Sequence, residues 1–415
     1  MSTYRIGTAV LDLDNPADRA KLEDLHSRRA RLLCECVHPP LEMYLARAAN
    51  GILVKRMPGT GSAHAPGCPS YEPPAELSGI AGLLGTAILE DADNGTTILR
   101  LGFPMTKRGP QPAPSPGTGQ SDTAKADTKK MTLRGLLHCL WEEARLNHWD
   151  PRWAGKRNWR VIHAHLSDVA SSKTTATDPL SQTLFVPEPF NADHKDEIAH
   201  RRRTNLARMS NRRSGQKNYM IVIGEVKEIA TSRAGFKIVM RHLPDFHFGM
   251  PIELHARFRK KFETDIALWD KDPNNHLVVA ATFSMNAAGY ATIEELTAMA
   301  TNSNWIPIEN GDDERRLVQI LTDEKRAFLK VLRYGLPASR PTATAVLTDA
   351  RPKPVTLYIL PPEASDDYRT ALRELVDGSD FLPWFWQPIA DDTLKLPPIT
   401  GYAGMRFPVT KPAAA

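Results

Sequence analysis

The chain has 415 residues, of which 41% are hydrophobic and 24% are charged, and its formal net charge is +5. This length exceeds what one hydrophobic core usually supports, so we expect two or three domains, and the ordinary composition excludes wholesale disorder. The mild positive charge permits a polyanionic partner but does not require one.

The N-terminal residues predict neither a signal peptide nor a membrane segment. Residues 1–14 alternate apolar and polar side chains instead of forming an apolar block. The longest apolar runs, such as residues 220–223, are too short to cross a bilayer. We therefore expect a cytoplasmic protein.

The first predicted elements are a strand at residues 4–13 and a helix that begins after the cap Asn15 with Pro16. Helical spacing of leucines extends this helix through Leu33. Residues 42–57 then alternate around Asn50-Gly51, which is typical of a hairpin.

Two pairs of metal-ligand residues flank this hairpin, and they use three of the four cysteines of the chain. Three thiolates and one imidazole would fill the tetrahedral shell of a structural zinc ion, with His38 as an alternative to His64. Reduced buried thiols and a disulfide are the other interpretations. The predicted zinc ligands are Cys34, Cys36, His64 and Cys68.

The composition divides the chain into five parts. Residues 104–130 are rich in Pro, Gly, Ser, Thr and Lys, which predicts a flexible linker. The fold class we predict is a multidomain α+β protein, whose parts are a zinc-ribbon-like N-terminal module (1–103), the linker (104–130), a helical basic region (131–217), a mixed α/β domain (218–390) and a loose Pro-rich tail (391–415).

The basic region begins with predicted helices at residues 131–147 and 158–170, and a strand at 183–186 follows. Between the helices, Trp149 and Trp153 alternate with arginines, a pattern typical of single-strand nucleic-acid binding. The alternative is that these tryptophans pack in the junction of the helices, as we expect for Trp159.

A basic helix then runs through Arg213, and no acidic residue lies between residues 201 and 217. A solvated helix face is the ordinary interpretation, but a phosphate backbone would relieve the mutual repulsion of the cations. The predicted nucleic-acid contacts of this run are Arg201, Arg202, Arg203, Arg208, Arg212 and Arg213.

Strands and helices alternate in the C-terminal part. The predicted strands are residues 219–229, 236–241, 276–283, 343–347 and 355–360. The predicted helices are residues 252–269, 293–300, 313–334 and 366–377.

A metal-dependent nuclease is the first alternative function. Glu225 and Lys227 form a Glu-x-Lys motif on a predicted strand, for which Glu188 is the candidate second acid. Charged side chains on the wet face of a strand explain the motif equally well.

Two further arrangements of residues are weaker indications of a metal-dependent nuclease. Glu314 and Asp349 follow the element order of a nuclease core that lacks its Glu-x-Lys. His242, Asp245 and His247 could form a metal corner, although turn chemistry is the ordinary interpretation. Loops for nucleotide phosphates and the Gly-x-Ser-x-Gly motif are absent from the sequence.

An interaction protein without nucleic acid is the second alternative. It would use an exposed patch from Trp384 to Trp386 and the Pro-rich tail to bind a protein partner.

Five phrases carry a resemblance over nearly the whole chain: LVKRMPGTGSAHAPGCPSYEPP, MTLRGLLHCLWEEA, IVIGEVKEI, NWIPIEN and LPASRPTATAVLTD. In this order they resemble a bacterial family known as a domain of unknown function, number eleven seventy-three. The resemblance implies an accessory role in plasmids and integrative elements, and it implies no activity. We therefore expect a zinc-stabilised, nucleic-acid-binding accessory protein of a mobile element.

Overall fold

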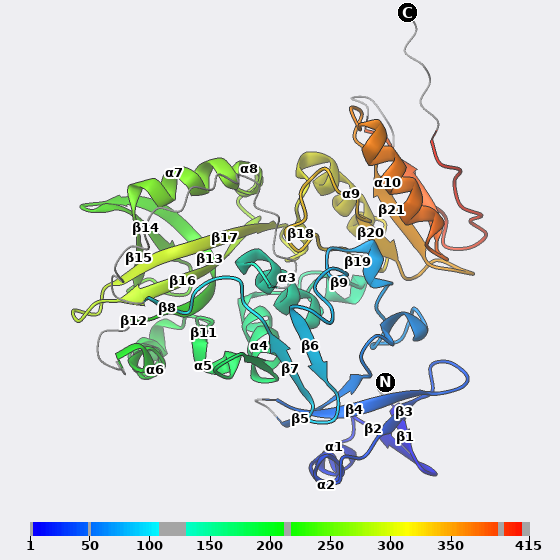
Figure 1. Ribbon diagram of the computed structural model, residues 1–415, viewed down its shortest axis with the longest axis horizontal. Helices are drawn as coiled ribbons and strands as arrows, with labels where there is room; N and C mark the ends of the chain where they lie inside the picture. The colour runs from blue at the N-terminus through cyan, green and yellow to red at the C-terminus, as the bar shows by residue number, and fades with distance from the viewer. Residues whose placement is uncertain (1–2, 49–50, 108–129, 211–216, 389–393, 409–415) are drawn as a thin grey trace, which may run out of the picture.

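The computed structural model describes residues 3–48, 51–107, 130–210, 217–388 and 394–408, which form a mixed α/β protein with several sheets (Figure 1). Asn50, Arg212, Arg213 and most of the predicted linker lie outside the described residues. The division into domains at residues 103, 130, 217 and 390 stays a prediction. Within the described ranges, every helix is too short or too polar to cross a bilayer.

The N-terminal sheet has the strand order β2-β1-β3-β4-β5 and carries two short helices on one side (Figure 1). Its elements are β1 (Thr3–Ile6), β2 (Ala9–Asp12), α1 (Pro16–Ala20), α2 (Leu22–Ser27), β3 (Leu32–Cys34), β4 (Leu41–Ala48) and β5 (Gly51–Arg56). The hairpin of β4 and β5 is confirmed, as is the cap, since the Asn15 side chain accepts a hydrogen bond from Ala17 N.

Two predictions for this sheet are wrong. The single strand at residues 4–13 is a hairpin, because Gly7 turns the chain with a φ of +55°. The helix predicted through Leu33 ends at Ser27, and Leu32 begins a strand whose side chains fill the small core of this sheet. Helical spacing of leucines did not distinguish a short helix from the buried strand that follows it.

Two helices form the centre of the molecule, and the sequence predicted both. Thr132 caps α3 (Leu133–Glu143) and Asn158 caps α4 (Trp159–Ser171) through side-chain bonds to backbone amides. Their apolar faces meet the three-stranded sheet β10-β7-β6 and strands of the next sheet in one core. The neighbouring elements are β6 (Ile88–Asp91), β7 (Thr96–Leu99), β8 (Thr106–Lys107), β10 (Lys173–Thr175), α5 (Leu180–Thr183), β11 (Leu184–Phe185), α6 (Lys195–Leu206) and β12 (Lys217–Asn218).

Five strands then close into a barrel. β13 pairs β14, β14 pairs β15, β15 pairs β17, β17 pairs β16, and β16 pairs β13. Only the β15–β17 pair is parallel, and the helices lie between the third and the fourth strand. The elements are β13 (Met220–Ser232), β14 (Gly235–Met240), β15 (His247–Met250), α7 (Ile252–Lys261), α8 (Glu263–Lys271), β16 (His276–Met285) and β17 (Ala291–Thr301).

This connectivity is that of an OB-fold, a small Greek-key barrel. The length of β13 allows closure, because its first half pairs with β16 and its second half with β14, with a bulge between Val226 and Glu228. At Gly224 a Cβ atom would overlap the sulfur of buried Met240, so a larger residue there would displace the Met240 side chain. The chain thus bends where two sheets share one strand.

Two helix predictions for the barrel need correction. The helix expected at residues 293–300 is β17, which pairs with β16 along its whole length. Its apolar residues matched helical spacing, but the long-range pairing overrides that local pattern. The helix expected at residues 252–269 is interrupted at Phe262 and forms α7 and α8.

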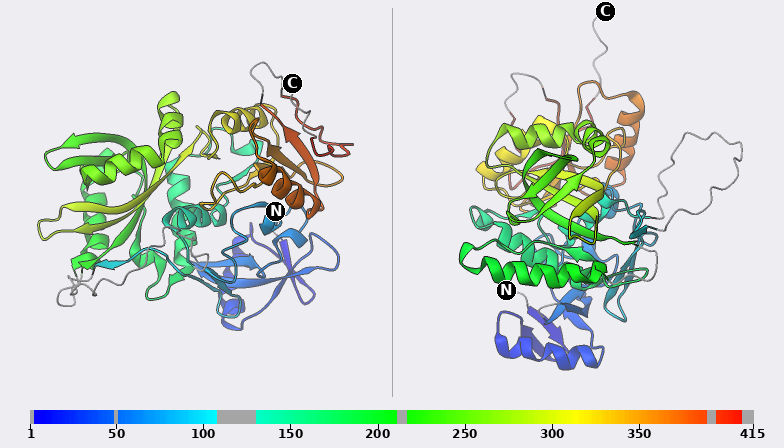
Figure 2. Two further views of the ribbon diagram at one scale, coloured as in Figure 1. Left: turned by 45° about the horizontal axis from the view of Figure 1, so that its top comes forward. Right: turned by 90° about the vertical axis from the view of Figure 1, so that its left-hand side faces the viewer.

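The C-terminal sheet has the order β22-β21-β20-β19-β9 and lies between two helices, α9 on one face and α10 on the other (Figures 1 and 2). Its elements are β9 (His148–Trp149), α9 (Gly311–Asp323), β19 (Phe328–Lys330), β20 (Ala345–Leu347), β21 (Val355–Ile359), α10 (Asp366–Asp377) and β22 (Leu382–Trp386). The short β18 (Pro307–Ile308) pairs with β17 and leads into α9. The helix predicted at residues 313–334 therefore ends at Asp323, and Phe328 begins a strand.

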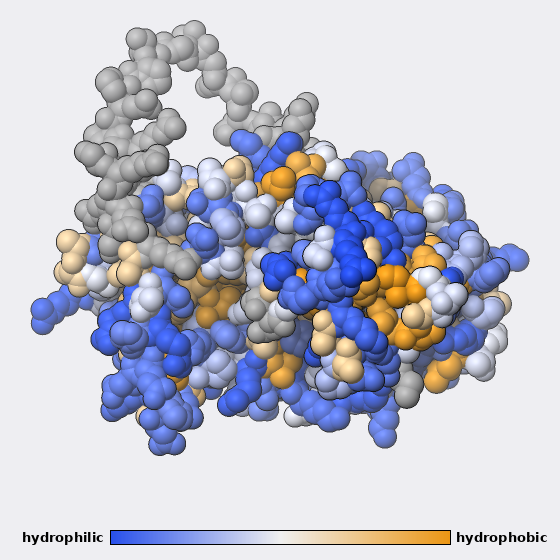
Figure 3. All heavy atoms as spheres, turned by 90° about the horizontal axis from the view of Figure 1, so that it is seen from below, coloured by the Kyte–Doolittle hydropathy of each residue, from blue (hydrophilic) through white to orange (hydrophobic). Residues whose placement is uncertain are grey.

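The predicted exposed patch from Trp384 to Trp386 is wrong. The three side chains of this segment are between 3% and 6% exposed, because β22 is covered on both faces. Trp384 and Trp386 face the core under α9, and Phe385 faces the core under α10. The surface itself is largely hydrophilic on the face seen from below, where hydrophobic side chains form smaller groups (Figure 3).

Candidate metal centre and nucleic-acid interface

The hairpin of β4 and β5 brings the two predicted ligand pairs together. Cys34 ends β3 and Cys36 follows it, whereas His64 and Cys68 follow β5. In the described part of the chain, these four residues are the one group of three or more metal-type side chains whose ligand atoms all lie within 4.8 Å of one another.

The distances within the cluster fit a tetrahedral ion. Cys34 Sγ lies 3.6 Å from Cys68 Sγ, and His64 Nδ1 lies 3.2 Å from Cys36 Sγ and 3.6 Å from Cys68 Sγ. Zinc bonds of about 2.3 Å to sulfur and about 2.0 Å to nitrogen give tetrahedral edges of about 3.8 Å and 3.5 Å. These three distances are therefore close to those of a closed zinc shell, and all four ligand atoms lie within 4.8 Å of one another.

Backbone amides and burial complete this cluster. Ala65 N donates to Cys36 Sγ at 3.5 Å and Ser70 N donates to Cys68 Sγ at 3.4 Å, bonds that stabilise thiolate sulfur. His64 is 2% exposed, whereas His38 is more exposed and lies outside the cluster. The fourth member is thus His64, and burial raises the pKa of the Cys34 thiol to about 12 in the protein without an ion.

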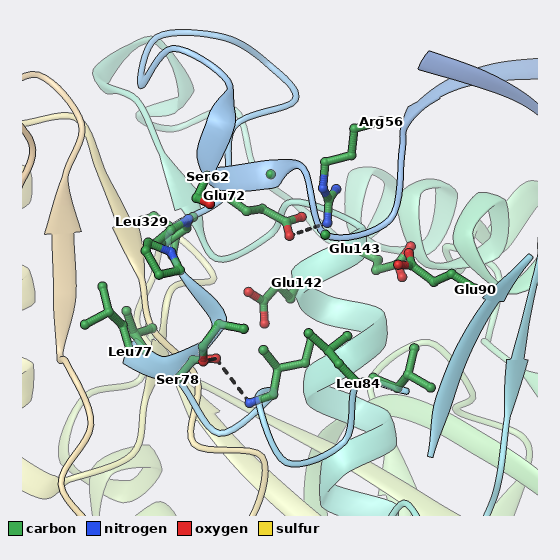
Figure 4. A pocket seen from close by; sticks show the side chains of 18 residues that line it. Arg56, Ser62, Glu72, Leu77, Ser78, Leu84, Glu90, Glu142, Glu143 and Leu329 are labelled. Atoms are coloured by element: carbon green, nitrogen blue, oxygen red, sulfur yellow. Dashed lines mark hydrogen bonds and ion pairs between the residues drawn. The ribbon is translucent and has the colours of Figure 1, made fainter. Parts of the chain in front are cut away.

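The segment that carries His64 and Cys68 forms a wall of a small acidic cavity of about 100 Å³ (Figure 4). Glu142 of α3 points toward the centre of this cavity, with Arg56 and Glu72 above it and Leu77 and Leu84 on the opposite side. Arg56 forms an ion pair with Glu72. Glu143, which also lines the cavity, is paired with Lys55 and Lys173.

These contacts separate the titration of the two adjacent glutamates of α3. Burial, with Glu72 nearby, raises the pKa of Glu142 to about 8, although Tyr334 Oη donates a hydrogen bond to it at 2.5 Å. The lysines lower the pKa of Glu143 and overcome the opposite effect of its burial. Near neutral pH, Glu142 is therefore protonated and Glu143 ionised.

The same segment also lines a larger cleft of about 430 Å³. Cys68 and Tyr71 line it, together with residues that follow α3 and β20. Trp153 lines this cleft with a 38% exposed side chain, but Trp149 is 3% exposed and packs in the core of the C-terminal sheet. A buried ring cannot stack on a base, so of the two predicted stacking groups only Trp153 presents an accessible ring.

The basic run has counter-charges that the sequence did not reveal. Arg201 pairs with Glu188 at 2.8 Å, and Arg202 pairs with Asp245 at 2.8 Å while its guanidinium lies over the Phe246 ring. Arg203 is exposed, without an ion pair among the described residues. Arg208 lies in a short 3-10 helix after α6, and Arg212 and Arg213 lie outside the described residues.

The Glu-x-Lys motif does not resemble a metal site in the structure. Glu225 is 2% exposed, and its Oε1 accepts from Arg241 Nε at 2.7 Å and lies 2.9 Å from His276 Nδ1. Burial alone would raise the pKa of Glu225, but hydrogen bonds from His242 and His276, with the charge of Arg241, lower it to about 2. Lys227 is exposed at the bulge of β13.

The remaining nuclease candidates also have internal partners. Glu314 is fully buried and pairs with Lys330 at 3.0 Å, and Asp349 pairs with Arg326 at 2.8 Å. The ring of His242 stacks on Trp159, while His247 lies at the start of β15. These residues do not form a common site.

The outer face of β14 and β15 carries groups that sequence reasoning missed. Lys237 lies opposite Gly249 in the register, and the Tyr290 ring lies where a Cβ atom at Gly249 would be. Tyr290 is 38% exposed and meets the His247 ring edge-on at 5.9 Å. A wrong helix prediction for β17 hid the barrel, and with it the loop that presents Tyr290.

The fold and the cluster together define the class of this protein. It is a mixed α/β protein with a closed five-stranded barrel and a Cys₃His cluster whose spacing suits a structural zinc ion. The chain belongs to the family described as protein of unknown function (DUF1173), whose model matches residues 4–389. The resemblance to that family is thereby confirmed. Neither the curated proteins nor the solved structures contain a match to this chain.

Proposed function

We propose that this protein binds single-stranded nucleic acid on the barrel, with a zinc ion holding its N-terminal part together. The observation that carries the proposal is the outer face of β14 and β15, the second and third strands of an OB-type barrel. Lys237 and His247 lie on these strands, and Tyr290 of the loop between β16 and β17 lies over them. Those strands and the adjoining loops are where such barrels bind oligonucleotides.

The chemistry of this face suits bases and phosphates. Exposed aromatic rings stack on bases without sequence preference, and cations beside them meet the backbone. The basic helix α6 reaches the same region, because Arg202 pairs with Asp245 just before β15. Glu228 lies opposite Val239 and Asp245 lies just before β15, so this region also carries acidic side chains. Lys237 supplies positive charge on the strands, and exposed Arg203 of α6 adds to it from near Asp245.

Binding is tested with labelled single-stranded DNA and RNA by fluorescence anisotropy over a range of salt concentrations. Tyr290→Ala should weaken binding about tenfold, because a stacked base contributes about 1–3 kcal/mol. Lys237→Glu and Arg203→Glu should weaken binding for every sequence and reduce its salt dependence. Arg19→Glu, at an exposed position of α1, is the matched control. An equal loss of affinity in Arg19→Glu, or no binding of nucleic acid by the wild type at low salt, would contradict the proposal.

Zinc is tested by metal analysis of protein purified without a chelator. We expect about one zinc ion per chain, held by three cysteines and His64, in a closed shell that stabilises and leaves no position for catalysis. Cys36→Ser should reduce the zinc content, whereas His38→Ala should not. Protein that folds without zinc would remove this part of the proposal. The role in mobile elements stays a prediction.

A further inference from the structure

The cleft beside Cys68 is a second candidate site, separate from the barrel face. We propose that it binds one phosphate-bearing nucleotide unit, with Arg145, Arg157 and Arg351 around the phosphate and Trp153 against the base. The inference does not depend on binding at the barrel, because no residue of β14 or β15 lines this cleft among the described residues.

The three arginines are held by backbone carbonyl groups. Arg145 donates to Pro69 O, and Arg351 donates to Thr348 O at 3.1 Å and to Ala350 O at 2.9 Å. Arg157 donates to Leu146 O at 2.8 Å and to His148 O. Carbonyl oxygens orient a guanidinium group but do not neutralise its charge, so each arginine is positioned and still cationic.

The acidic side chains of the cleft are already paired. Asp150 binds Arg152 through both carboxylate oxygens, at 2.9 Å and 3.0 Å, and Asp349 binds the buried Arg326. Within the described ranges, no ion pair joins Arg145, Arg157 or Arg351 to a carboxylate. These three arginines therefore have no carboxylate of the described residues in direct contact, and the charge of Glu72 acts on Arg145 only from beyond ion-pair distance.

Arg157 is the buried one of these three arginines. Its side chain is 8% exposed, and its guanidinium lies 5.4 Å from the Trp149 ring and 5.8 Å from the Trp153 ring. Burial alone lowers the pKa of Arg157 to about 10. A buried cation without an anion is unfavourable, and a phosphate in the cleft would supply the missing charge.

The aromatic ring indicates the rest of the ligand. Trp153 lies in a short 3-10 helix (Pro151–Trp153) at the side of the cleft and is 38% exposed. An indole ring beside arginines is typical of sites where a base stacks and its phosphate is bound. Inorganic phosphate would use only the arginines, so the ring is what points to a nucleotide.

The test compares three probes by calorimetry with the full chain: inorganic phosphate, adenosine monophosphate and a short single-stranded oligonucleotide. Arg351→Gln should weaken nucleotide binding at least tenfold, and Trp153→Ala about tenfold. Arg152→Gln is the matched control, because Arg152 is in the same cleft but is 86% exposed and already paired. Thermal unfolding of each variant checks that it folds.

The outcomes separate the two sources of the nucleotide. In Tyr290→Ala, whose binding at the barrel is weakened, an oligonucleotide that binds no tighter than the monophosphate would identify a free nucleotide. Tighter binding that is lost on adding Arg351→Gln would identify a unit of a longer strand. Tyr290→Ala should leave monophosphate binding unchanged, so that failure at the barrel and failure at the cleft are distinguishable. The inference is overturned if the wild type binds no nucleotide. It is also overturned if Arg152→Gln weakens nucleotide binding as much as Arg351→Gln does, or if Trp153→Ala leaves the nucleotide affinity unchanged.

Discussion

Residues of the segment that carries His64 and Cys68 line two cavities of opposite charge. The acidic cavity is lined by Glu142 and Glu143 near the end of α3, and the basic cleft by Arg145 just after that helix. In the acidic cavity, Glu72 and Glu143 form ion pairs with cations of the chain, and burial raises the pKa of Glu142 to about 8. In the basic cleft, Arg145, Arg157 and Arg351 donate to backbone carbonyl groups, and none of them forms an ion pair with a carboxylate among the described residues.

This comparison shows that the sign of a charged cluster is a weaker guide to function than whether its charges are paired with opposite charges of the chain. A cavity whose charges are paired internally can be stable without a ligand, whereas unpaired buried charge must be compensated from outside. The same criterion distinguishes Arg201 and Arg202, which have carboxylate partners, from Arg203 on the same helix.

Removal of the metal ligands should have the largest effect, because both cavities lose a common wall. The core of the N-terminal sheet is small, and zinc binding supplies about 10 kcal/mol or more to folding in small zinc domains. For Cys34→Ser we expect residues 3–80 to exchange amide hydrogens rapidly while the barrel stays protected. Hydrogen exchange with mass spectrometry measures this, and Cys139→Ala is the control. Protection of the N-terminal sheet in Cys34→Ser would contradict the expectation.

The stability of the protein around the acidic cavity should depend strongly on the lysines that pair with Glu143. Lys173 is fully buried, and its Nζ lies 2.5 Å from Glu143 and 3.2 Å from Thr97 Oγ1. Lys173→Met should lower the free energy of unfolding by about 3 kcal/mol, because the carboxylate of Glu143 would lose its closest cation. Urea unfolding measures the change. Arg351→Gln in the basic cleft should change the free energy of unfolding by less than about 0.5 kcal/mol. An equal loss of stability in both variants would contradict the proposed difference between the two cavities.

Glu142 should make stability depend on pH. Its pKa is raised from 4.5 to about 8, so the folded protein holds a proton that the unfolded chain releases. This contribution is fully present below pH 4.5 and is lost as the pH rises toward 8. Relative to the wild type, the free energy of unfolding of Glu142→Gln should rise by about 3.5 kcal/mol between pH 5 and pH 8, since one pKa unit corresponds to about 1.4 kcal/mol.

Urea unfolding at both pH values tests this expectation. Glu374→Gln, at an exposed position of α10, is the control and should follow the wild type. A variant at Glu142 with the same pH dependence as the wild type would show that the carboxyl group is ionised in the folded protein.

The smallest effects are expected on α6. Arg201 and Glu188 are 48% and 31% exposed, so Arg201→Gln should cost less than about 1 kcal/mol of stability. Arg203→Gln should weaken nucleic-acid binding more than Arg201→Gln does, because the charge of Arg201 is already partly neutralised. Parallel anisotropy titrations decide the order, and the reverse order would contradict the criterion of charge balance.

The sequence by itself determined the local features of this protein. The caps Asn15, Thr132 and Asn158 and the hairpin around Gly51 follow from short-range patterns, and the spacing of two ligand pairs around that hairpin indicated the cluster. These features depend on neighbours within a few residues, which a sequence displays directly.

Only the tertiary structure decided the rest. β17 became a strand because it pairs with β16, and Trp384 to Trp386 became core because two helices cover β22. The counter-charges of Arg201, Arg202 and Glu225 come from other elements, and both cavities are lined by segments distant along the chain. Burial and charge balance are sums over such distant neighbours, so no local pattern can contain them.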